Sequence, residues 1–304
     1  MNWITKFLKP KIKSIFKKRS SEEKDTLWTN CSCGKLTLKE EFVSNLYVCP
    51  SCDKHHTISN KKRFSIFFDN EYEILEHGVP EENPINFKDT KDYELRIQEA
   101  RAKTKENESM LAATGKVNGI DVTVASMSFH YMGGSVSPYV GECFLSAVQH
   151  CITNRQPLIL MATSGGMRMQ TGILSLQQMA RMTLGCSELK KNKLPFICLA
   201  TGHVLGGTTA SFASLADIIY SESKDFLWGF SGKRIIEQNL REKLADEVQT
   251  SQWVYEHGQI DKIVSRKEIK SEISNILSIL LKIKEKENIN SDNVAIDKSI
   301  QAAI

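Results

Sequence analysis

Ser164-Gly165-Gly166-Met167-Arg168 and Leu205-Gly206-Gly207-Thr208 are the two stretches that decide how this 304-residue chain folds. Each glycine pair follows a short apolar run, at 158–162 and at 194–199, and each precedes a small-residue or helix-periodic segment. A strand, a glycine turn and a helix in this order direct backbone N–H groups and the positive end of a helix dipole at a bound anion. Two such units in succession predict stacked turns whose N–H groups face a ligand, and a transient oxyanion suits these donors.

The segments around these turns indicate an α/β domain. Asn118-Gly119 is a strong hairpin signal between the segments at 114–117 and 120–126, and residues 216–220 return as a further strand. Three successive strand–turn–helix units are typical of a repeating ββα spiral, and equally of an open parallel sheet: 121–154, 158–190 and 194–214. Apolar residues at helical spacing mark the expected helices: Val140, Phe144, Val148 and Cys151; Met179, Met182, Cys186 and Leu189; Ile273, Ile276, Leu277 and Leu280.

The composition is that of a protein with a hydrophobic core. Hydrophobic residues make up 41% of the chain, and no apolar run is long enough for a transmembrane helix. The N-terminus lacks the uninterrupted apolar segment of a secretory signal. The net charge of +4 is unevenly distributed, because all the charged side chains of residues 1–19 are basic. The rest of the chain is therefore close to neutral, which argues against wholesale wrapping of nucleic acid.

Four zones follow from the distribution of charge, cysteine and apolar residues. Residues 1–25 form a basic arm, residues 26–60 hold a cysteine cluster, residues 61–285 form the main body, and residues 286–304 are a polar tail that we expect to be disordered. Apolar residues in the arm roughly follow helical spacing between lysines. Such an arm can lie on an anionic membrane or a nucleic acid, although a solvated docking arm is more common.

Four of the eight cysteines lie in the second zone and predict a metal site: Cys31, Cys33, Cys49 and Cys52. Without an export signal, clustered thiols indicate a metal more often than disulfides. The second pair has the C-x-x-C spacing of a zinc knuckle, whereas the first pair is one residue shorter. His55 or His56 could replace one ligand, and free thiols in a metal-free ribbon are the alternative. Four protein ligands leave no open position, so the expected Zn²⁺ is structural.

Many further motifs have the order and spacing of a known family. They are Trp28-Thr29-Asn30-Cys31, Asn45 to Cys52, His55-His56, Phe87-Lys88-Asp89 with Tyr93 and Arg96, Met132 to Ser135, Ser164 to Gln170, Gly206-Gly207 with Ala210-Ser211-Phe212, Gly229 to Gly232, Ile236-Glu237-Gln238, Arg241 to Leu244, and Gly258 to Asp261. Over residues 26–280 the chain resembles the β subunits of bacterial- and plastid-type acetyl-CoA carboxylase carboxyltransferases.

The resemblance implies a fold and an activity. The fold is a crotonase-like (ClpP/crotonase) ββα spiral preceded by a small N-terminal zinc ribbon. The activity is transfer of a carboxyl group from carboxybiotin, on its carrier protein, to acetyl-CoA, which gives malonyl-CoA for fatty-acid synthesis. Biotin would act as a substrate on that carrier and would not be bound covalently here. One structural Zn²⁺ is the implied metal, and ATP and nucleotide binding are also implied.

Partners and location follow from the same resemblance. It implies a carboxyltransferase α subunit in an α₂β₂ assembly, with the biotin carboxyl carrier protein and biotin carboxylase in the larger complex. The implied location is the bacterial cytoplasm, with the plastid stroma as the alternative.

The resemblance also assigns roles at the glycine turns. Gly206 and Gly207 would form the oxyanion hole for the thioester. Gly133 and Gly134, with the first glycine turn, would shape the pocket wall: Ser164, Gly165 and Gly166. Only glycine lets the backbone approach a ligand closely there, and tight strand-on-helix packing is the alternative. Arg168 could bind a CoA phosphate, but fixing its own turn by bonding carbonyls is the favoured interpretation.

The chain departs from the family pattern around this pocket. Met167 stands where the pattern has Ala, Thr171 where it has Glu, residues 202–205 where it has Asp-Pro-Thr-Thr, and Lys233 where it has Pro. An altered acyl preference or reduced activity is the possible consequence. His203 could act as an acid or base but is more often a bystander at such a turn. Lys233 and Arg234 are candidates for phosphate contact, with a solvated surface as the alternative.

Two other functions compete with the carboxyltransferase. A different crotonase-superfamily acyl-CoA enzyme needs a carboxylate over the thioester, and no acidic residue closely follows either glycine turn. A zinc-ribbon protein could bind nucleic acid through the ribbon and the basic arm, but this leaves the large α/β body without a role. The carboxyltransferase is therefore the favoured prediction.

Overall fold

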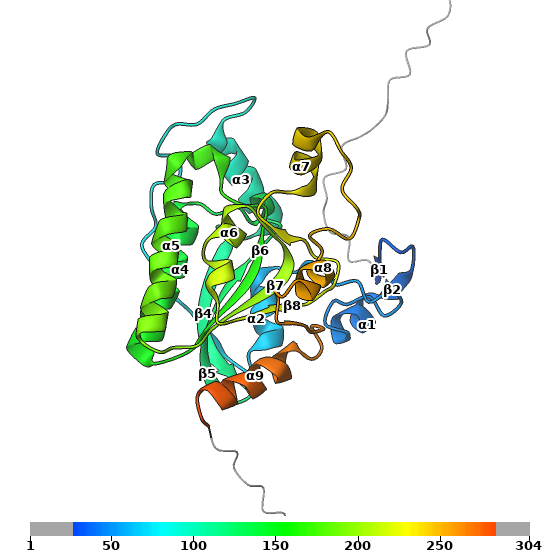
Figure 1. The fold of residues 1–304 in the computed structure, drawn as a ribbon, viewed down its shortest axis with the longest axis vertical. Coiled ribbons are helices and arrows are strands. Elements are labelled where there is room, and N and C mark those ends of the chain that lie inside the picture. The colour runs from blue at the N-terminus through cyan, green and yellow to red at the C-terminus, as the bar shows by residue number, and fades with distance from the viewer. Residues whose placement is uncertain (1–26, 284–304) are drawn as a thin grey trace, which may run out of the picture.

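The computed structural model describes residues 27–283, and one eight-stranded sheet lies at its centre (Figure 1). The arm at 1–25 and the tail at 286–304 lie outside the described residues. The strands follow the order β10-β8-β7-β6-β5-β4-β3, and β9 pairs with β7 off this path. Their bounds are β3 Tyr72–Ile74, β4 Met110–Val117, β5 Ile120–Met127, β6 Leu158–Ser164, β7 Phe196–Leu205, β8 Ile218–Ser221, β9 Trp228–Gly229 and β10 Lys262–Ile263.

The sheet has an antiparallel part and a parallel part. β3, β4 and β5 are antiparallel, and Val117 pairs with Ile120 across the Asn118-Gly119 turn. Both turn residues have positive φ, 46° and 80°, as a tight hairpin requires, so the predicted hairpin is confirmed. From β5 to β10 the main-sheet neighbours are parallel, so helical crossovers must connect them.

Helices cover both faces of the sheet. α4 and α5 lie side by side against one face, and α2 and α9 pack against the other (Figure 1). The predicted helices after Pro138, after the first glycine turn and near residue 277 are confirmed. The bounds are α2 Asn60–Phe67, α3 Tyr93–Thr104, α4 Pro138–Asn154, α5 Ile173–Lys191, α6 Gly207–Ala210, α7 Lys233–Leu240, α8 Ser251–Glu256 and α9 Ile269–Leu280, with short 3₁₀ turns at Met132–Gly134, Met169–Thr171 and Ala213–Leu215.

Strand β6 shows why the sequence of the central strands is apolar without interruption. Leu158 and Leu160 belong to the core shared with α4 and α5, whereas Ile159 and Met161 belong to the core shared with α2 and α9. All four side chains are buried. A parallel strand covered on both faces needs apolar residues at every position, which is the pattern found here.

Strand β7 changes one of its strand partners before it ends. Residues 197–200 pair with β8, but Val204 and Leu205 pair with β9 instead. On the other side, the register with β6 shifts between Ala162 and Ser164. The strand pairing therefore changes just where the glycine turns begin, as expected for a ββα spiral rather than for an ordinary open sheet.

A small ribbon precedes the main body. β1 (Trp28–Asn30) and β2 (Leu36–Leu38) form a two-stranded antiparallel sheet, followed by α1 (Lys39–Ser44) and an isolated bridge between Val48 and His55. In Figure 1 this ribbon lies beside α8, at the edge of the body. Over residues 27–283, none of the helices is long and apolar enough to cross a membrane.

Candidate active site

Three glycine-containing turns at the carboxyl ends of β5, β6 and β7 pack on one another. The N–H of Gly165 donates to the carbonyl of Gly133 over 2.8 Å, which joins the first and second turns. A methyl group built on Gly206 would lie 3.1 Å from the Cα of Gly166, so the second and third turns are in direct contact. Gly134 is closer still to its neighbour, since a methyl group there would lie 2.2 Å from the carbonyl oxygen of Thr163.

The two glycines of the third turn have different environments. Gly206 has φ 66° and ψ −139°, a conformation open essentially only to glycine, and its N–H donates to the carbonyl of Gly229 over 3.0 Å. Within residues 27–283, the N–H of Gly207 donates to no backbone carbonyl of a turn, loop or helix cap. Of the two amides predicted to form an oxyanion hole, Gly207 is therefore the free donor, and Gly206 sets the backbone angle that presents it.

The helix after this turn is shorter than the sequence suggests. α6 contains only Gly207–Ala210, so it supplies unbonded N–H groups but only a small helix dipole. The expected helix dipole at this turn is therefore small, and individual backbone N–H groups are the donors that remain for an anion. The first turn also lacks an immediate helix, because a 3₁₀ turn at Met169–Thr171 precedes α5.

Ser164 braces two of the turns through its hydroxyl group. The Ser164 Oγ accepts hydrogen bonds from the N–H of Gly166 over 3.0 Å and from the hydroxyl of Thr208 over 2.9 Å. The side chain is fully buried. Its contacts are therefore within the protein, and it holds the β6 and β7 turns at a fixed separation.

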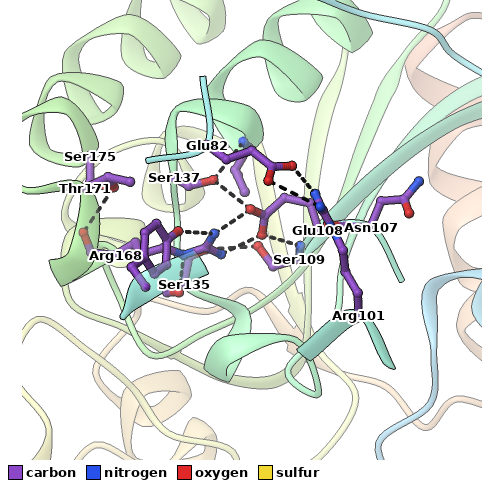
Figure 2. Close-up of polar contacts among 12 residues, drawn as sticks. Glu82, Arg101, Asn107, Glu108, Ser109, Ser135, Ser137, Arg168, Thr171 and Ser175 are labelled. Carbon is purple, nitrogen blue, oxygen red and sulfur yellow. Dashed lines mark hydrogen bonds and ion pairs between the residues drawn. The ribbon is translucent and has the colours of Figure 1, made fainter. Parts of the chain in front are cut away.

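Arg168 lies in a buried polar network behind the turns (Figure 2). Its guanidinium forms a two-pronged ion pair with Glu108, with Nη2 2.6 Å from Oε1. It also donates to the hydroxyl and the carbonyl of Ser135, over 3.0 and 2.9 Å, and to the hydroxyl of Tyr93. Burial alone would lower the pKa of Arg168, but the Glu108 carboxylate raises it. The side chain thus bonds the carbonyl of Ser135 and ties the β6 turn to the β5 turn, rather than bonding carbonyls of its own turn.

Glu108 is a residue that the sequence did not indicate. Its Oε1 also accepts from the N–H of Ser109 over 2.7 Å, and its Oε2 accepts from the hydroxyl of Ser137 over 3.2 Å. Ser137 in turn caps α4 by accepting from the N–H of Val140. The carboxylate therefore connects the start of β4, the start of α4 and the β6 turn. It is 60 residues from Arg168 in sequence, so no local pattern marks the pair.

An open cleft of about 520 Å³ borders the glycine turns. Gly133 and Gly165 contribute backbone to its wall, and α3 contributes Arg96 and Lys103. Met167, where the family pattern has alanine, also lines the cleft, and a methyl group on Gly207 would lie only 2.6 Å from the Met167 Cγ. This departure therefore narrows the space directly beside the free Gly207 amide.

His203 and Lys233 have partners within the protein. The Nδ1 of His203 accepts from the N–H of Leu227 over 2.9 Å, and burial lowers the pKa of this imidazole. The ring is therefore neutral near pH 7 and fixes the chain as it enters β9. The ammonium of Lys233 bonds the carbonyl of Ala245 and the carboxylate of Asp246, over 3.1 and 2.9 Å. A phosphate contact from Lys233 or Arg234 stays a prediction.

The four predicted cysteine ligands come together in the ribbon. Their Sγ atoms all lie within 4.8 Å of one another, with Cys31 3.7 Å from Cys52 and Cys33 3.9 Å from Cys49. Zn–S bonds of about 2.3 Å in a tetrahedron give S–S edges of about 3.8 Å, so the cluster fits one structural Zn²⁺. A hydrogen bond from the backbone N–H of Cys33 lowers the pKa of the Cys31 thiol to about 5. The N–H of Lys54 opposes the shift at Cys52, but burial and the neighbouring sulfurs raise the pKa of that thiol to about 12.

The two histidines of the ribbon have supporting positions outside the four-sulfur cluster. The Nε2 of His56 lies 3.4 Å from the Cys31 Sγ, and the Nε2 of His55 accepts from the N–H of Arg266 over 3.2 Å. The shortened first pair of cysteines therefore completes the set of four without a histidine. His55 instead connects the ribbon to the body.

Residues 85–301 match the model of the carboxyl transferase domain family. The chain belongs to this carboxyltransferase family. The acetyl-coenzyme A carboxylase carboxyl transferase subunit beta of Pelagibacter ubique is 40% identical over 302 residues, which cover 96% of this chain and 97% of that protein. The protein of the same name from a Jannaschia species is 38% identical over 284 residues, 92% of this chain and 88% of its own length. The family predicted from the sequence motifs is therefore confirmed.

Solved structures of a transcarboxylase and of a malonate decarboxylase have the same fold. Transcarboxylase 12S with methylmalonyl-coenzyme A bound superimposes with a TM-score of 0.59 at 19% identity, over 79% of this chain and 43% of that one. This carboxyltransferase thus spans less than half the length of that transcarboxylase chain. The Pseudomonas malonate decarboxylase MdcD–MdcE hetero-dimer gives a TM-score of 0.55 at 15% identity, over 79% of this chain and 94% of that one. The predicted crotonase-like fold is confirmed.

Proposed function

We propose that this chain is the β subunit of a two-subunit acetyl-CoA carboxylase carboxyltransferase. It transfers a carboxyl group from carboxybiotin, carried on the biotin carboxyl carrier protein, to acetyl-CoA and so forms malonyl-CoA. The family membership supports the reaction class. The observation that carries the proposal is the free Gly207 amide where the packed glycine turns meet, next to Met167, which lines the open cleft.

The backbone performs the main catalytic task in this proposal. Loss of a proton from the acetyl methyl group turns the thioester oxygen into an enolate oxyanion, and the Gly207 N–H donates to that oxygen. Cleavage of the N–C bond of carboxybiotin releases CO₂ and a ureido anion, which accepts the proton from the acetyl methyl group. The enolate carbon then attacks CO₂ to form the new C–C bond of malonyl-CoA. No side-chain base is therefore required, which agrees with a buried Ser164 and a neutral His203 that both bond to the protein itself.

The surrounding residues hold the substrate and the turns. Gly133, Gly134, Gly165 and Gly166 form the wall along which the thioester lies, and Arg168 acts as a positioning residue behind it. The cleft beside α3 receives the CoA portion. A Zn²⁺ ion on the four cysteines would stabilise the fold of the ribbon and take no part in the reaction.

The remaining sequence-based expectations belong to this proposal. The chain divides into a ribbon at 26–60 and a catalytic body at 61–285, and it works in an α₂β₂ assembly with an α subunit that faces biotin. A cytoplasmic location suits this assembly. Nucleic-acid binding by the ribbon rests on the basic arm at 1–25, and no contact among the described residues favours it over the carboxyltransferase.

The decisive experiment removes the Gly207 N–H without removing the turn. Proline is tolerated at the first position of a helix and has no N–H. Met167→Ala removes the nearer of the two side chains that a new ring would meet, and the other is the flexible end of Met179 at 2.9 Å. We therefore compare Met167→Ala/Gly207→Pro with Met167→Ala alone, each mixed with the cognate α subunit. The measurement is malonyl-CoA decarboxylation and carboxyl transfer to biocytin.

Loss of one oxyanion donor should lower kcat by roughly 10²–10³-fold in the double variant relative to Met167→Ala. Circular dichroism and co-elution with the α subunit establish that both variants are folded and assembled. Equal activity of the two variants would remove Gly207 from the mechanism. Absence of activity in the wild-type chain with a verified α subunit would overturn the carboxyltransferase assignment itself.

A further inference from the structure

A second buried charge cluster lies between the ribbon and the body. It contains Arg63 from α2, Glu222 after β8 and Arg266 before α9, whose side chains are 5%, 0% and 1% exposed. Two guanidinium groups therefore share one carboxylate. Burial of an uncompensated charge is costly, so an excess of one positive charge needs an explanation.

The hydrogen bonds of the cluster show which group carries the excess. Arg266 donates to Glu222 Oε2 from Nε and Nη2, over 3.0 and 2.8 Å, and its Nη1 donates to the carbonyls of Leu46 and His56, each over 3.1 Å. Glu222 uses its other oxygen to accept from Arg63 Nη1. The Nε and Nη2 of Arg63 have no hydrogen-bond acceptor among the residues that the structure describes. Arg63 is therefore the cation with unused donors.

A cavity of about 100 Å³ borders these groups. Arg63 lines it together with Phe67, Met161 and Leu199, three apolar side chains that are almost completely buried. Lys267 lies at the same cavity, whereas Lys270, also in the lining, is paired with Asp69 at 2.8 Å. Glu222 and Arg266 also line the cavity, which thus combines a polar end of net positive charge with an apolar wall.

We propose that this cavity binds a small aliphatic carboxylate, whose head group pairs with Arg63 and whose short chain lies against Phe67, Met161 and Leu199. A carboxylate matches the unused guanidinium donors and balances the excess charge. Water could satisfy the donors but not the charge, and an inorganic oxyanion would leave the apolar wall without a partner. Since one water occupies about 30 Å³ in the liquid, the cavity has room for a short chain only.

Charge and position support the same ligand. Burial lowers the pKa of Arg63 to about 10, with Glu222 opposing this effect, so the group stays cationic at neutral pH. The cavity is also lined by Leu46 of the ribbon and by Ile269 at the start of α9. A bound carboxylate would therefore contact the ribbon, α2 and α9 at once. This site is separate from the glycine turns, and the proposal does not depend on the proposed function.

The test observes the cavity wall directly. The full chain is labelled with ¹³C-methyl methionine, and the Met161 resonance is assigned with Met161→Leu. Butyrate and acetate are then titrated at constant ionic strength, with butylamine as the cationic match for butyrate and inorganic phosphate as the tail-less oxyanion. Arg63→Met removes the charge at similar length, and Lys103→Met, in the open cleft, is the matched control for loss of a basic side chain.

Butyrate should shift the Met161 signal saturably and bind more tightly than acetate, whereas butylamine should leave the signal unchanged. Arg63→Met should weaken butyrate binding at least tenfold, and Lys103→Met should leave it unaltered. A Met161 signal that butyrate does not move, or that phosphate moves as strongly, would overturn the carboxylate site. If Arg63→Met fails to fold, the wild-type comparison of butyrate with butylamine and phosphate decides alone.

Discussion

Two buried arginine–glutamate clusters differ in how their charges balance. Behind the glycine turns, one arginine meets one glutamate, and the remaining donors of Arg168 are taken up by Ser135 and Tyr93. Between the ribbon and the body, Glu222 serves both Arg63 and Arg266. The balanced pair is complete within the protein, whereas the unbalanced cluster leaves donors beside a cavity.

The comparison indicates what each cluster does. A complete pair suits the task of holding catalytic backbone in place, because its donors are already taken up by other groups of the protein. An incomplete cluster at a junction between two parts of the chain is sensitive to what occupies the cavity beside it. Substitutions in the two clusters should therefore have different energetic consequences.

The largest effect is expected from Glu222→Gln. This change leaves two buried guanidinium groups with no carboxylate, and breaking a buried pair costs about 3–5 kcal/mol, so the upper part of this range is expected. Urea unfolding followed by circular dichroism measures the loss. Glu188→Gln, which breaks an exposed pair with Lys191, is the control and should change the free energy of unfolding by about 0–1 kcal/mol. A cost for Glu222→Gln equal to that of the control would mean that the cluster does not stabilise the fold.

Glu108→Gln should cost less stability but more activity. Only one guanidinium loses its carboxylate, and Arg168 keeps its contacts with Ser135 and Tyr93, so the lower part of the range of about 3–5 kcal/mol is expected. The turns that contain Ser135 and Arg168 should shift and misplace the backbone N–H donors at the glycine turns, so kcat should fall by roughly tenfold or more. Carboxyl transfer with the α subunit separates this effect from Glu222→Gln. A larger loss of activity in Glu222→Gln than in Glu108→Gln would contradict the roles assigned to the clusters.

Sequence patterns predicted the parts of the molecule that local rules determine. The hairpin at Asn118-Gly119 and the strand–turn segments at Gly165 and Gly206 follow from residues within a few positions of one another. The cysteines of the ribbon were also marked by spacing, and even the shortened first pair reaches the other two sulfurs. The fold and the location of the candidate site could therefore be predicted.

The buried clusters could not be predicted, because their members are distant in sequence. Arg63 and Glu222 are 159 residues apart, and Glu108 stands in a polar segment without periodicity. The different environments of Gly206 and Gly207 were also hidden, since the acceptor for Gly206 comes from β9. Which of the two amides is free depends on the position of β9, which comes later in the chain. The glycine motif itself does not predict that position.

The unbalanced cluster should also respond to acid. Burial alone would raise the pKa of Glu222, but Arg63 and Arg266 lower it below the ordinary value. A carboxyl whose pKa is lowered in the folded state stabilises fully above its unfolded pKa of about 4.3, and this contribution is lost as the pH falls toward the folded pKa. One proton taken up on unfolding corresponds to about 1.4 kcal/mol per pH unit. Urea unfolding between pH 5 and pH 3 should therefore show a shallower slope in Glu222→Gln, and parallel slopes would contradict the direction of the shift.

The smallest effect is expected from Arg63→Met, and it distinguishes the two arginines of the unbalanced cluster. Removal of Arg63 leaves Glu222 paired with Arg266 and relieves the excess charge, so the lost hydrogen bond should cost only about 1 kcal/mol. Arg266→Met should cost about 3–5 kcal/mol, because it also leaves the carbonyls of Leu46 and His56 without their donor. Urea unfolding with an unchanged m-value in all three proteins makes the comparison valid. Equal losses for the two variants would mean that Arg63 is as fully engaged as Arg266, and the excess charge beside the cavity would then have no basis.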